Sequence, residues 1–193
     1  MSLAATSTLA TSPAAAPTAA ASPIGAPTAA ARTASTVAAP PAAAATTIRA
    51  RAAAYRRGLR AGEPVARISF PRARRRPLVR AGLDQETIDR GPGWYQRSWL
   101  PGEGRLIYLA GHNRSHGGPF GPVAKLRRGD TVVLTLPYAT ATYRVTGRRL
   151  VSERDLSILR GGRSELLRLQ TSTVPSSDRR IVVSARPTRL APR

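Results

Sequence analysis

Two features of the sequence predict a mainly β fold, a barrel or a sandwich, that follows a disordered N-terminal stretch. From residue 65 onward, short runs of alternating apolar and polar residues recur between turns that contain glycine or proline. A series of short strands with turns between them is typical of β-barrels and β-sandwiches. Residues 1–47 are instead almost entirely Ala, Thr, Ser and Pro. Their side chains are too small to bury a core that offsets the entropy of the chain.

Residues 1–47 are therefore predicted to be a low-complexity, disordered stalk. Arg32 is the one charged residue in this stretch, and six prolines interrupt any continuous helix. No run approaches the roughly 18–20 apolar residues that cross a membrane. No basic start precedes a leucine-rich core, as it would in a signal peptide. A membrane anchor, if the protein has one, is expected outside the sequence shown.

Residues 48–64 are predicted to form a basic helix or linker. Thr47 is the expected N-cap, and Gly62 with Pro64 ends the helix. One face is apolar and comprises Ile48, Ala52, Tyr55 and Leu59. Five arginines lie among these positions, at 49, 51, 56, 57 and 60. Two interpretations stay open: a helix that packs on the domain with its arginines solvated, or a helix that binds an anionic membrane surface.

The central part of the chain is predicted to contain strands at 66–71, 106–110, 131–136 and 140–151. Each range shows the two-residue alternation of a strand or a short buried apolar run. Residues 72–77, RARRRP, form a basic loop, and 136–140 suggests a hairpin turn. Short helical segments are expected at 84–90 and at 152–159, where Ser152 is the predicted cap.

Residues 166–185 are predicted to be two strands joined by a polar loop. Leu167, Leu169 and Thr171 alternate with polar residues in the first strand, and Ile181 and Val183 do so in the second. Successive side chains of a strand point to opposite faces of a sheet. If the apolar sets face the core, the polar residues at 172 and 180 lie on the opposite, open face.

Three motifs, taken in order, resemble the signature regions of the sortases, the cysteine transpeptidases of Gram-positive surfaces. They are Gly111-His112 after an apolar strand, Leu169-Gln170-Thr171-Ser172 at the end of another, and RIVVSA at 180–185. Flanking segments at 91–104 and 116–130, and Pro175, are also similar to the family. The resemblance covers about residues 65–185, and its details are most similar to the class E-like sortases of actinobacteria.

This resemblance implies a closed sortase-type barrel of about eight strands with short helices. It spans 65–187, and 188–193 are left as a C-terminal tail. The family's catalytic His, Cys and Arg correspond here to His112, Ser172 and Arg180. Thr171 and Tyr95 are expected to contact substrate. Arg179 competes with Arg180, but the alternation points it toward the core, where an unpaired guanidinium is costly.

Ser172 stands where the family has its nucleophilic cysteine, and the chain contains no cysteine at all. A serine hydroxyl stays neutral and needs an oriented base, whereas a thiol is readily converted to a thiolate. The sequence places no carboxylate beside His112. We therefore expect the chain as written to be inactive or very slow. Two origins of Ser172 stay open, a deliberate substitution that traps substrate and a natural serine variant.

The resemblance implies cleavage of an LPxTG-like or LAxTG-like sorting signal between Thr and Gly. The acyl group then passes to an amine, in a cell-wall precursor or a pilin lysine. The expected location is the extracellular face of the membrane or the cell surface, and a monomer is expected. No cofactor or metal is expected. His116 follows His112 by four residues, but the glycines after it exclude a helix and no third ligand is evident.

The chain carries a net charge of +21, almost all of it from arginine. This charge favours anionic partners, here the polymers or lipids of a cell envelope. Two alternatives stay open. The first is a non-catalytic module of the same fold that binds a sorting signal or the cell wall. The second is an arginine-rich nucleic-acid binder, which the scarcity of aromatic residues and the absence of a known motif disfavour, so no nucleic acid is expected.

Overall fold

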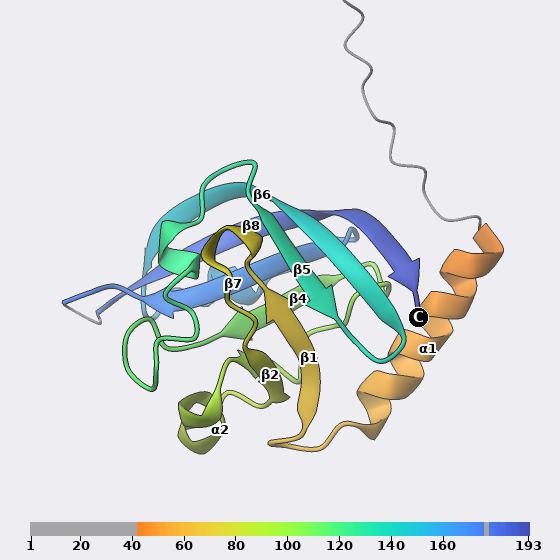
Figure 1. Cartoon of the computed structure of the whole chain (residues 1–193), viewed down its shortest axis with the longest axis horizontal. Coiled ribbons are helices and arrows are strands. Elements are labelled where there is room, and N and C mark those ends of the chain that lie inside the picture. The colour runs from red at the N-terminus through yellow and green to blue at the C-terminus, as the bar shows by residue number, and fades with distance from the viewer. Residues whose placement is uncertain (1–41, 176–177) are drawn as a thin grey trace, which may run out of the picture. The chain divides into compact units, whose positions relative to one another are not determined.

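The computed structural model describes residues 42–175 and 178–193, so 1–41 of the predicted stalk lie outside the described residues. Eight strands close into one barrel in the order β1-β2-β3-β4-β7-β8-β6-β5 (Figure 1), as the predicted fold class requires. The strands are β1 (Pro64–Ser69), β2 (Leu78–Ala81), β3 (Gly93–Trp94), β4 (Leu106–Ala110), β5 (Thr131–Thr135), β6 (Ala139–Ser152), β7 (Leu166–Ser172) and β8 (Arg179–Pro192). The helical segments are α1 (Ala42–Gly58), η1 (Pro71–Ala73), α2 (Gln85–Arg90), η2 (Val123–Lys125) and η3 (Leu156–Leu159).

The longer predicted strands are confirmed, and two very short ones were missed. Observed strands occupy the places expected for β1, β4, β5 and β6, and β5 pairs antiparallel with β6 as a hairpin. The prediction overlooked β2 and β3, which have four and two residues and show no clear alternation. The helical turn η3 begins after Asp155, whose carboxylate accepts from the amide of Ser157; Ser152 is not its cap.

The barrel core comes from one face of each strand. In β7, Leu167 and Leu169 are buried, and in β8 Ile181, Val183 and Ala185 are buried against them. These are the apolar sets that the alternation assigned to the core. The polar residues between them therefore emerge on the outer face of the barrel wall.

Helix α1 starts earlier than predicted and packs on the barrel. It begins at Ala42, and the hydroxyl of Thr47 donates back to the carbonyl of Ala43 within the helix instead of capping it. Ile48 and Ala52 are fully buried in the barrel core cluster, and the predicted apolar face is confirmed. The helix ends at Gly58, before the expected stop at Gly62.

An ion pair attaches α1 to the rest of the domain. The Nε atom of Arg56 lies 3.1 and 3.0 Å from the two carboxylate oxygens of Glu103, a residue only 5% exposed. The same guanidinium lies 4.5 Å from the ring centroid of Trp99. The structure thus favours the interpretation of α1 as a helix packed on the domain.

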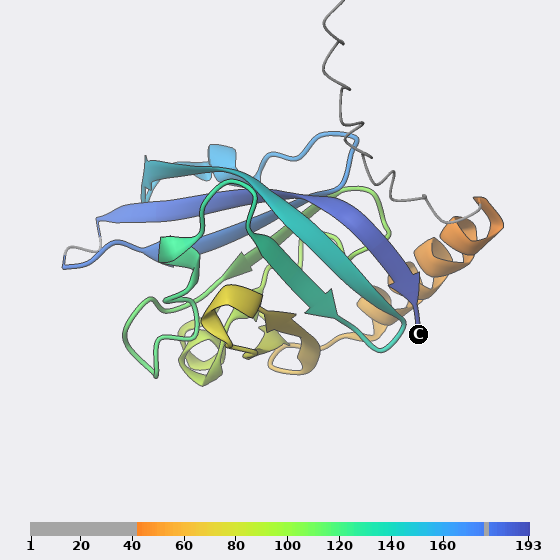
Figure 2. The ribbon, with the colours of Figure 1, turned by 45° about the horizontal axis from the view of Figure 1, so that its top comes forward.

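The prediction that residues 188–193 form a C-terminal tail is wrong. Strand β8 continues to Pro192 and pairs with β6 along its length, with Thr140 opposite Ala191 and Ala139 opposite Pro192. Figure 2 shows these two long strands side by side. Among residues 42–175 and 178–193, no helix is both long and apolar enough to span a membrane.

The Arg56–Glu103 pair gives a test of how α1 is held. Replacing Arg56 with Met leaves a buried carboxylate without its cation, so we expect the free energy of unfolding to fall by about 1–3 kcal/mol. Urea denaturation followed by circular dichroism measures this. The matched control is Arg57→Met, an exposed arginine of the same helix, which should change stability by less than about 0.5 kcal/mol. Equal losses in the two variants would contradict the assignment.

Candidate active site

Three neighbouring strands bring the predicted site residues into one row. Strands β4 and β7 are parallel, with Ala110 opposite Gln170, and β7 and β8 are antiparallel, with Ser172 opposite Arg180. The pairing of β4 with β7 continues past the end of β4, because the amide of Gly111 donates to the carbonyl of Gln170 over 3.1 Å. If this register is continued for two residues beyond β4, His112 falls opposite Ser172, and His112, Ser172 and Arg180 are called the row below.

The row lies on the outer face of the barrel wall. Paired residues of adjacent strands project on the same face, and neighbouring strands are about 4.8 Å apart. Leu169 and Thr171 face inward, so Ser172, the residue after Thr171, faces outward. Arg180 likewise faces outward, because it precedes the inward-facing Ile181. The hydroxyl and the guanidinium therefore emerge together at one end of β7 and β8, as the alternation predicted.

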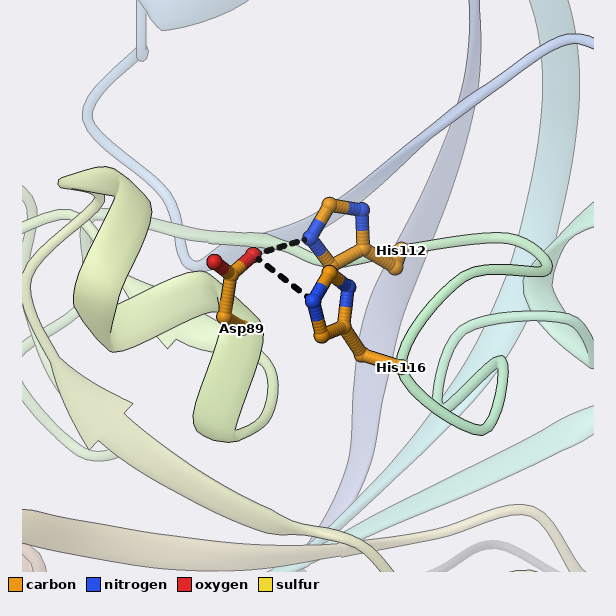
Figure 3. A group of neighbouring side chains, drawn as sticks. All are labelled: Asp89, His112 and His116. Carbon is orange, nitrogen blue, oxygen red and sulfur yellow. Dashed lines mark hydrogen bonds and ion pairs between the residues drawn. The ribbon is translucent and has the colours of Figure 1, made fainter.

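Asp89 is the carboxylate partner that sequence reasoning did not identify. It lies near the end of α2, and its Oδ1 atom is 2.9 Å from Nε2 of His112 (Figure 3). The hydrogen bond from His112 lowers the pKa of the Asp89 carboxyl below its usual value, so the group is ionised at neutral pH. An ionised carboxylate only accepts, so Nε2 of His112 carries the proton and Nδ1 is the acceptor of the neutral ring.

His116 stacks on His112 and shares the same carboxylate. The two ring centroids are 4.6 Å apart with planes inclined by 26°, and His116 Nε2 lies 3.5 Å from Asp89 Oδ1. The expectation that no third ligand accompanies the two histidines is wrong, because Asp89 completes a group of three possible ligands. This group could not be recognised in the sequence, because Asp89 lies 23 residues before His112.

Arg180 is held at the edge of the row by the loop after β6. Its Nη2 atom lies 3.3 Å from Oε2 of Glu153, and its side chain is 24% exposed. Arg179 opens β8 and is exposed. The alternation predicted that Arg179 points toward the core, but this residue is exposed because the buried positions of β8 begin at Ile181. Arg180 remains the arginine whose position is paired with Ser172.

Thr171 does not contact the open face, contrary to the prediction of a substrate contact. It is 2% exposed, and its hydroxyl donates to the carbonyl of Gly111 over 2.8 Å. Asn113 makes a second link of this kind, since its side-chain amide donates to the carbonyl of Ser172 over 2.8 Å. Both bonds join the end of β7 to the segment that carries His112, so they fix the two main chains relative to each other.

A second apolar cluster, which we call the outer cluster, lies on the outer side of the barrel wall, apart from the main core. Its buried members are Tyr108, Ala110, Val151, Ile158 and Val182, with Leu83, Tyr95 and Leu159 partly buried against them. The predicted substrate residue Tyr95 packs edge-to-face on Tyr108, with ring centroids 6.1 Å apart. Tyr95 thus lies on the same outer face as the row.

One arginine of β7 binds the main chain of residues 156–160, which lies beside the outer cluster. The Nη1 atom of Arg168 donates to the carbonyls of Ser157, Ile158 and Arg160. Burial lowers the pKa of this guanidinium below its usual value. Arg168 thus attaches residues 156–160 to the outer face of β7, beside the outer cluster.

Comparison with known proteins identifies the family. A family model described as the sortase domain matches residues 68–188, more than half of the chain. The chain belongs to the sortase family. Sortase D of Bacillus subtilis (strain 168) is 32% identical to it over 83 residues, which are 43% of this chain. The match spans only 40% of that relative's length.

Solved structures of several sortases share the fold. Sortase E from Streptomyces avermitilis aligns with a TM-score of 0.61 at 29% identity, over 69% of this chain and 93% of that one. Sortase E1 from Streptomyces coelicolor, solved with a tripeptide in its active site, aligns with a TM-score of 0.63 at 24% identity. That alignment covers 68% of this chain and 92% of that chain. SrtF from Corynebacterium diphtheriae has a TM-score of 0.66 at 21% identity, so the likeness of fold alone does not select a class.

The hydrogen bond between Asp89 and His112 predicts a measurable titration. Since this bond is the main cause of the lowered pKa of Asp89, His112→Gln should move that pKa upward, toward 3.8. The stabilisation that the bond provides is present above the ordinary pKa and is lost as pH falls through the lowered one. Carbon-13 NMR of the aspartate carboxyls measures the shift.

Asp84 is the matched control for this titration. Its pKa is lowered chiefly by hydrogen bonds from Thr87, not by a histidine. The His112→Gln variant should therefore leave the titration of Asp84 unchanged. If Asp89 titrates identically with and without the ring of His112, the bond does not form as described.

Proposed function

We propose that this sortase carries a transpeptidation site made of His112, Ser172 and Arg180 that acts on a peptide sorting signal. The observation that supports it most directly is the single row across β4, β7 and β8. In the proposed site, position 172 is the nucleophile station between the imidazole of His112 and the guanidinium of Arg180. Membership of the family supports the reaction type.

Each residue of the row has a chemical task in the proposed reaction. The nucleophile at position 172 gives its proton to His112 and attacks the carbonyl of the scissile bond, and the oxyanion that forms accepts hydrogen bonds from Arg180. His112 passes this proton to the leaving amine as the scissile C–N bond breaks, and an acyl-enzyme remains at position 172. An incoming amine then attacks this acyl group and gives its proton to His112, the bond to position 172 breaks, and that proton returns to position 172 as the new amide leaves.

Serine at position 172 makes this reaction very slow in the chain as it stands. A cysteine thiol has a pKa near ~8.5 and becomes a thiolate beside a basic group, whereas a serine hydroxyl stays protonated. His112, whose Nε2 atom bonds with Asp89, is the base that the proposal assigns to this hydroxyl. We infer that the protein binds and orients its substrate while turnover is blocked at the attack step.

We propose an LPxTG-like or LAxTG-like sorting signal, cleaved between Thr and Gly, as the substrate. The partly buried members of the outer cluster, Leu83, Tyr95 and Leu159, would contact the apolar residues that precede the scissile bond. The acceptor is an amine of a cell-wall precursor or a pilin lysine, at the extracellular face of the membrane. The net charge of +21 suits a cell envelope rich in anionic polymers and lipids.

A non-catalytic sorting-signal or cell-wall binding module is the second candidate, and one observation favours it. The observation is Ser172, which stands where the family has its nucleophilic cysteine. A protein of this kind would hold the signal without cleaving it.

Restoring the thiol separates these two functions. We expect Ser172→Cys to cleave a fluorogenic LPxTG or LAxTG peptide at least about 10²-fold faster than the unchanged chain, because the attack step regains a thiolate. Mass spectrometry should detect the acyl-enzyme and, with an added amine, the transpeptidation product. A folded Ser172→Cys protein that binds the peptide but never cleaves it would support the binding module instead.

The other two positions of the row are tested in the Ser172→Cys background. Adding His112→Ala should lower kcat/KM by about 10²–10⁴-fold, since it removes the acid. Adding Arg180→Ala should lower it by about 10²–10³-fold, the usual effect of losing an oxyanion donor. Arg179→Ala is the matched control and should change the rate by less than threefold, or about 0.7 kcal/mol. A larger effect at Arg179 than at Arg180 would reverse the assignment of the arginine.

A further inference from the structure

We propose that Asp89, His112 and His116 form a binding site for a divalent transition-metal ion, with Zn²⁺ the best fit. We propose further that the bound ion withdraws His112 from the chemistry of the site. The first statement stands on the geometry and chemistry of the three side chains. The second rests on the proposed catalytic role of His112, and the two are tested separately below.

The ligand atoms already lie close to the spacing that zinc requires. His112 Nε2 and His116 Nε2 are 2.9 and 3.5 Å from Asp89 Oδ1, and all three ligand atoms lie within 4.8 Å of one another (Figure 3). Ligands held about 2.0–2.1 Å from a tetrahedral zinc ion are roughly 3.3 Å apart. Small side-chain rotations are therefore enough to admit the ion.

A tight loop, not a helix, brings the two histidines together. The amide of Phe120 donates to the carbonyl of His112 over 2.9 Å, which folds the segment back on itself. His116 has a left-handed backbone conformation with a φ of 52°. Gly118, also at positive φ, lies so close to Asn113 that a β-carbon would be 2.6 Å from the carbonyl oxygen there. This turn holds the ring of His116 over that of His112.

The donor set selects the class of ion. Two imidazole nitrogens and one carboxylate oxygen suit Zn²⁺ and its neighbours among transition metals, whereas Mg²⁺ and Ca²⁺ prefer oxygen ligands. Three protein ligands leave a fourth position for water, as in zinc sites that stay open. The side chains of His112, Asp89 and His116 are 22, 33 and 44% exposed, so an ion has access from solvent.

The carboxylate oxygen is oriented for this role. Besides its bond with Nε2 of His112, Asp89 Oδ1 accepts from the side-chain amide of Gln85 over 2.6 Å. Gln85 acts as the outer partner that metal-binding carboxylates usually have. A cation placed between this oxygen and the two rings would replace the His112 donor without disturbing Gln85.

Occupation of the site would inhibit the enzyme through His112. The same Nε2 atom that faces Asp89 would become a metal ligand. A ring fixed by the ion can neither turn toward the substrate nor carry a second proton. Zn²⁺ would thus act as a reversible inhibitor whose ligands include a residue, His116, that has no part in the proposed reaction.

The binding statement is tested by isothermal titration calorimetry on the untagged, metal-free full chain with Ser172. The chain has two histidines and no cysteine, so no thiolate competes for the ion. We expect saturable binding of one Zn²⁺ per chain, with the affinity reduced more than about 10-fold by His116→Ala and by Asp89→Asn. Mg²⁺ in excess should not compete.

Glu86→Gln is the matched control for the loss of a carboxylate. Glu86 lies on the same helix as Asp89 and pairs with Arg90 on an exposed surface, so this variant should bind Zn²⁺ unchanged. Circular dichroism establishes that each variant is folded. NMR of the histidine ring protons should show both rings shifting together at substoichiometric Zn²⁺. The absence of saturable binding, or equal affinity in His116→Ala, would overturn the site.

The inhibition statement is tested in the Ser172→Cys variant with the cleavage assay. We expect Zn²⁺ to inhibit cleavage and the addition of His116→Ala to raise the inhibitory concentration more than about 10-fold. Inhibition that persists unchanged in His116→Ala would mean that zinc acts at the new thiolate, and would overturn this half. If Ser172→Cys cleaves no peptide, the proposed function fails, while the calorimetric result still decides the metal site.

Discussion

The hydrogen-bonded register of β4, β7 and β8 is the constraint on which the site depends. His112 lies far from Ser172 and Arg180 in the sequence, and the pairing of β4 with β7 brings the segment that leads into His112 beside the strand that ends at Ser172. A slip of one residue in any of these pairings would turn a member of the row into the core. The buried leucines and valines of the inner face prevent that slip, so the core of the barrel also fixes its outer chemistry.

The arginine-rich composition serves the fold as well as the charge. Thirty-one basic residues face ten acidic ones, so most arginines cannot pair with a carboxylate. Several instead donate to backbone carbonyls, for which the forked guanidinium with its five N–H groups is well suited. The arginines that contact carbonyls in this way include Arg51, Arg75, Arg80, Arg144 and Arg168. A positive surface and a stable loop arrangement thus come from the same residues.

Local pattern predicted the barrel wall, whereas the roles of His112, Ser172 and Arg180 stay a prediction from the family motifs. The alternation in 166–185 was enough to assign the inner and outer faces of β7 and β8, because a period of two leaves one choice once the apolar set is known. It failed where elements are too short to show a period, as in β2 and β3. Thr171 was expected to contact substrate because it precedes Ser172, although its parity with Leu167 and Leu169 places it on the inner face, where the structure has it.

The partners of His112 were beyond local pattern. Asp89 comes from a short helix and His116 from a glycine-rich turn, and neither spacing carries a period that points to the other. What decides their meeting is the path of the loop back to the carbonyl of His112, a tertiary contact. Sequence reasoning excluded a histidine pair because it considered helical spacing alone, and a left-handed residue achieved the same juxtaposition by a different route.

The hydrogen bonds from Arg168 to residues 156–160 affect which amino-acid substitutions that segment can accept. The guanidinium contacts main-chain oxygens, which every amino acid supplies. Side chains along that wall can therefore be exchanged without loosening its attachment. Residues 156–160 can thus change in chemical character while the pairing of β7 with β8, which positions Ser172 opposite Arg180, stays the same.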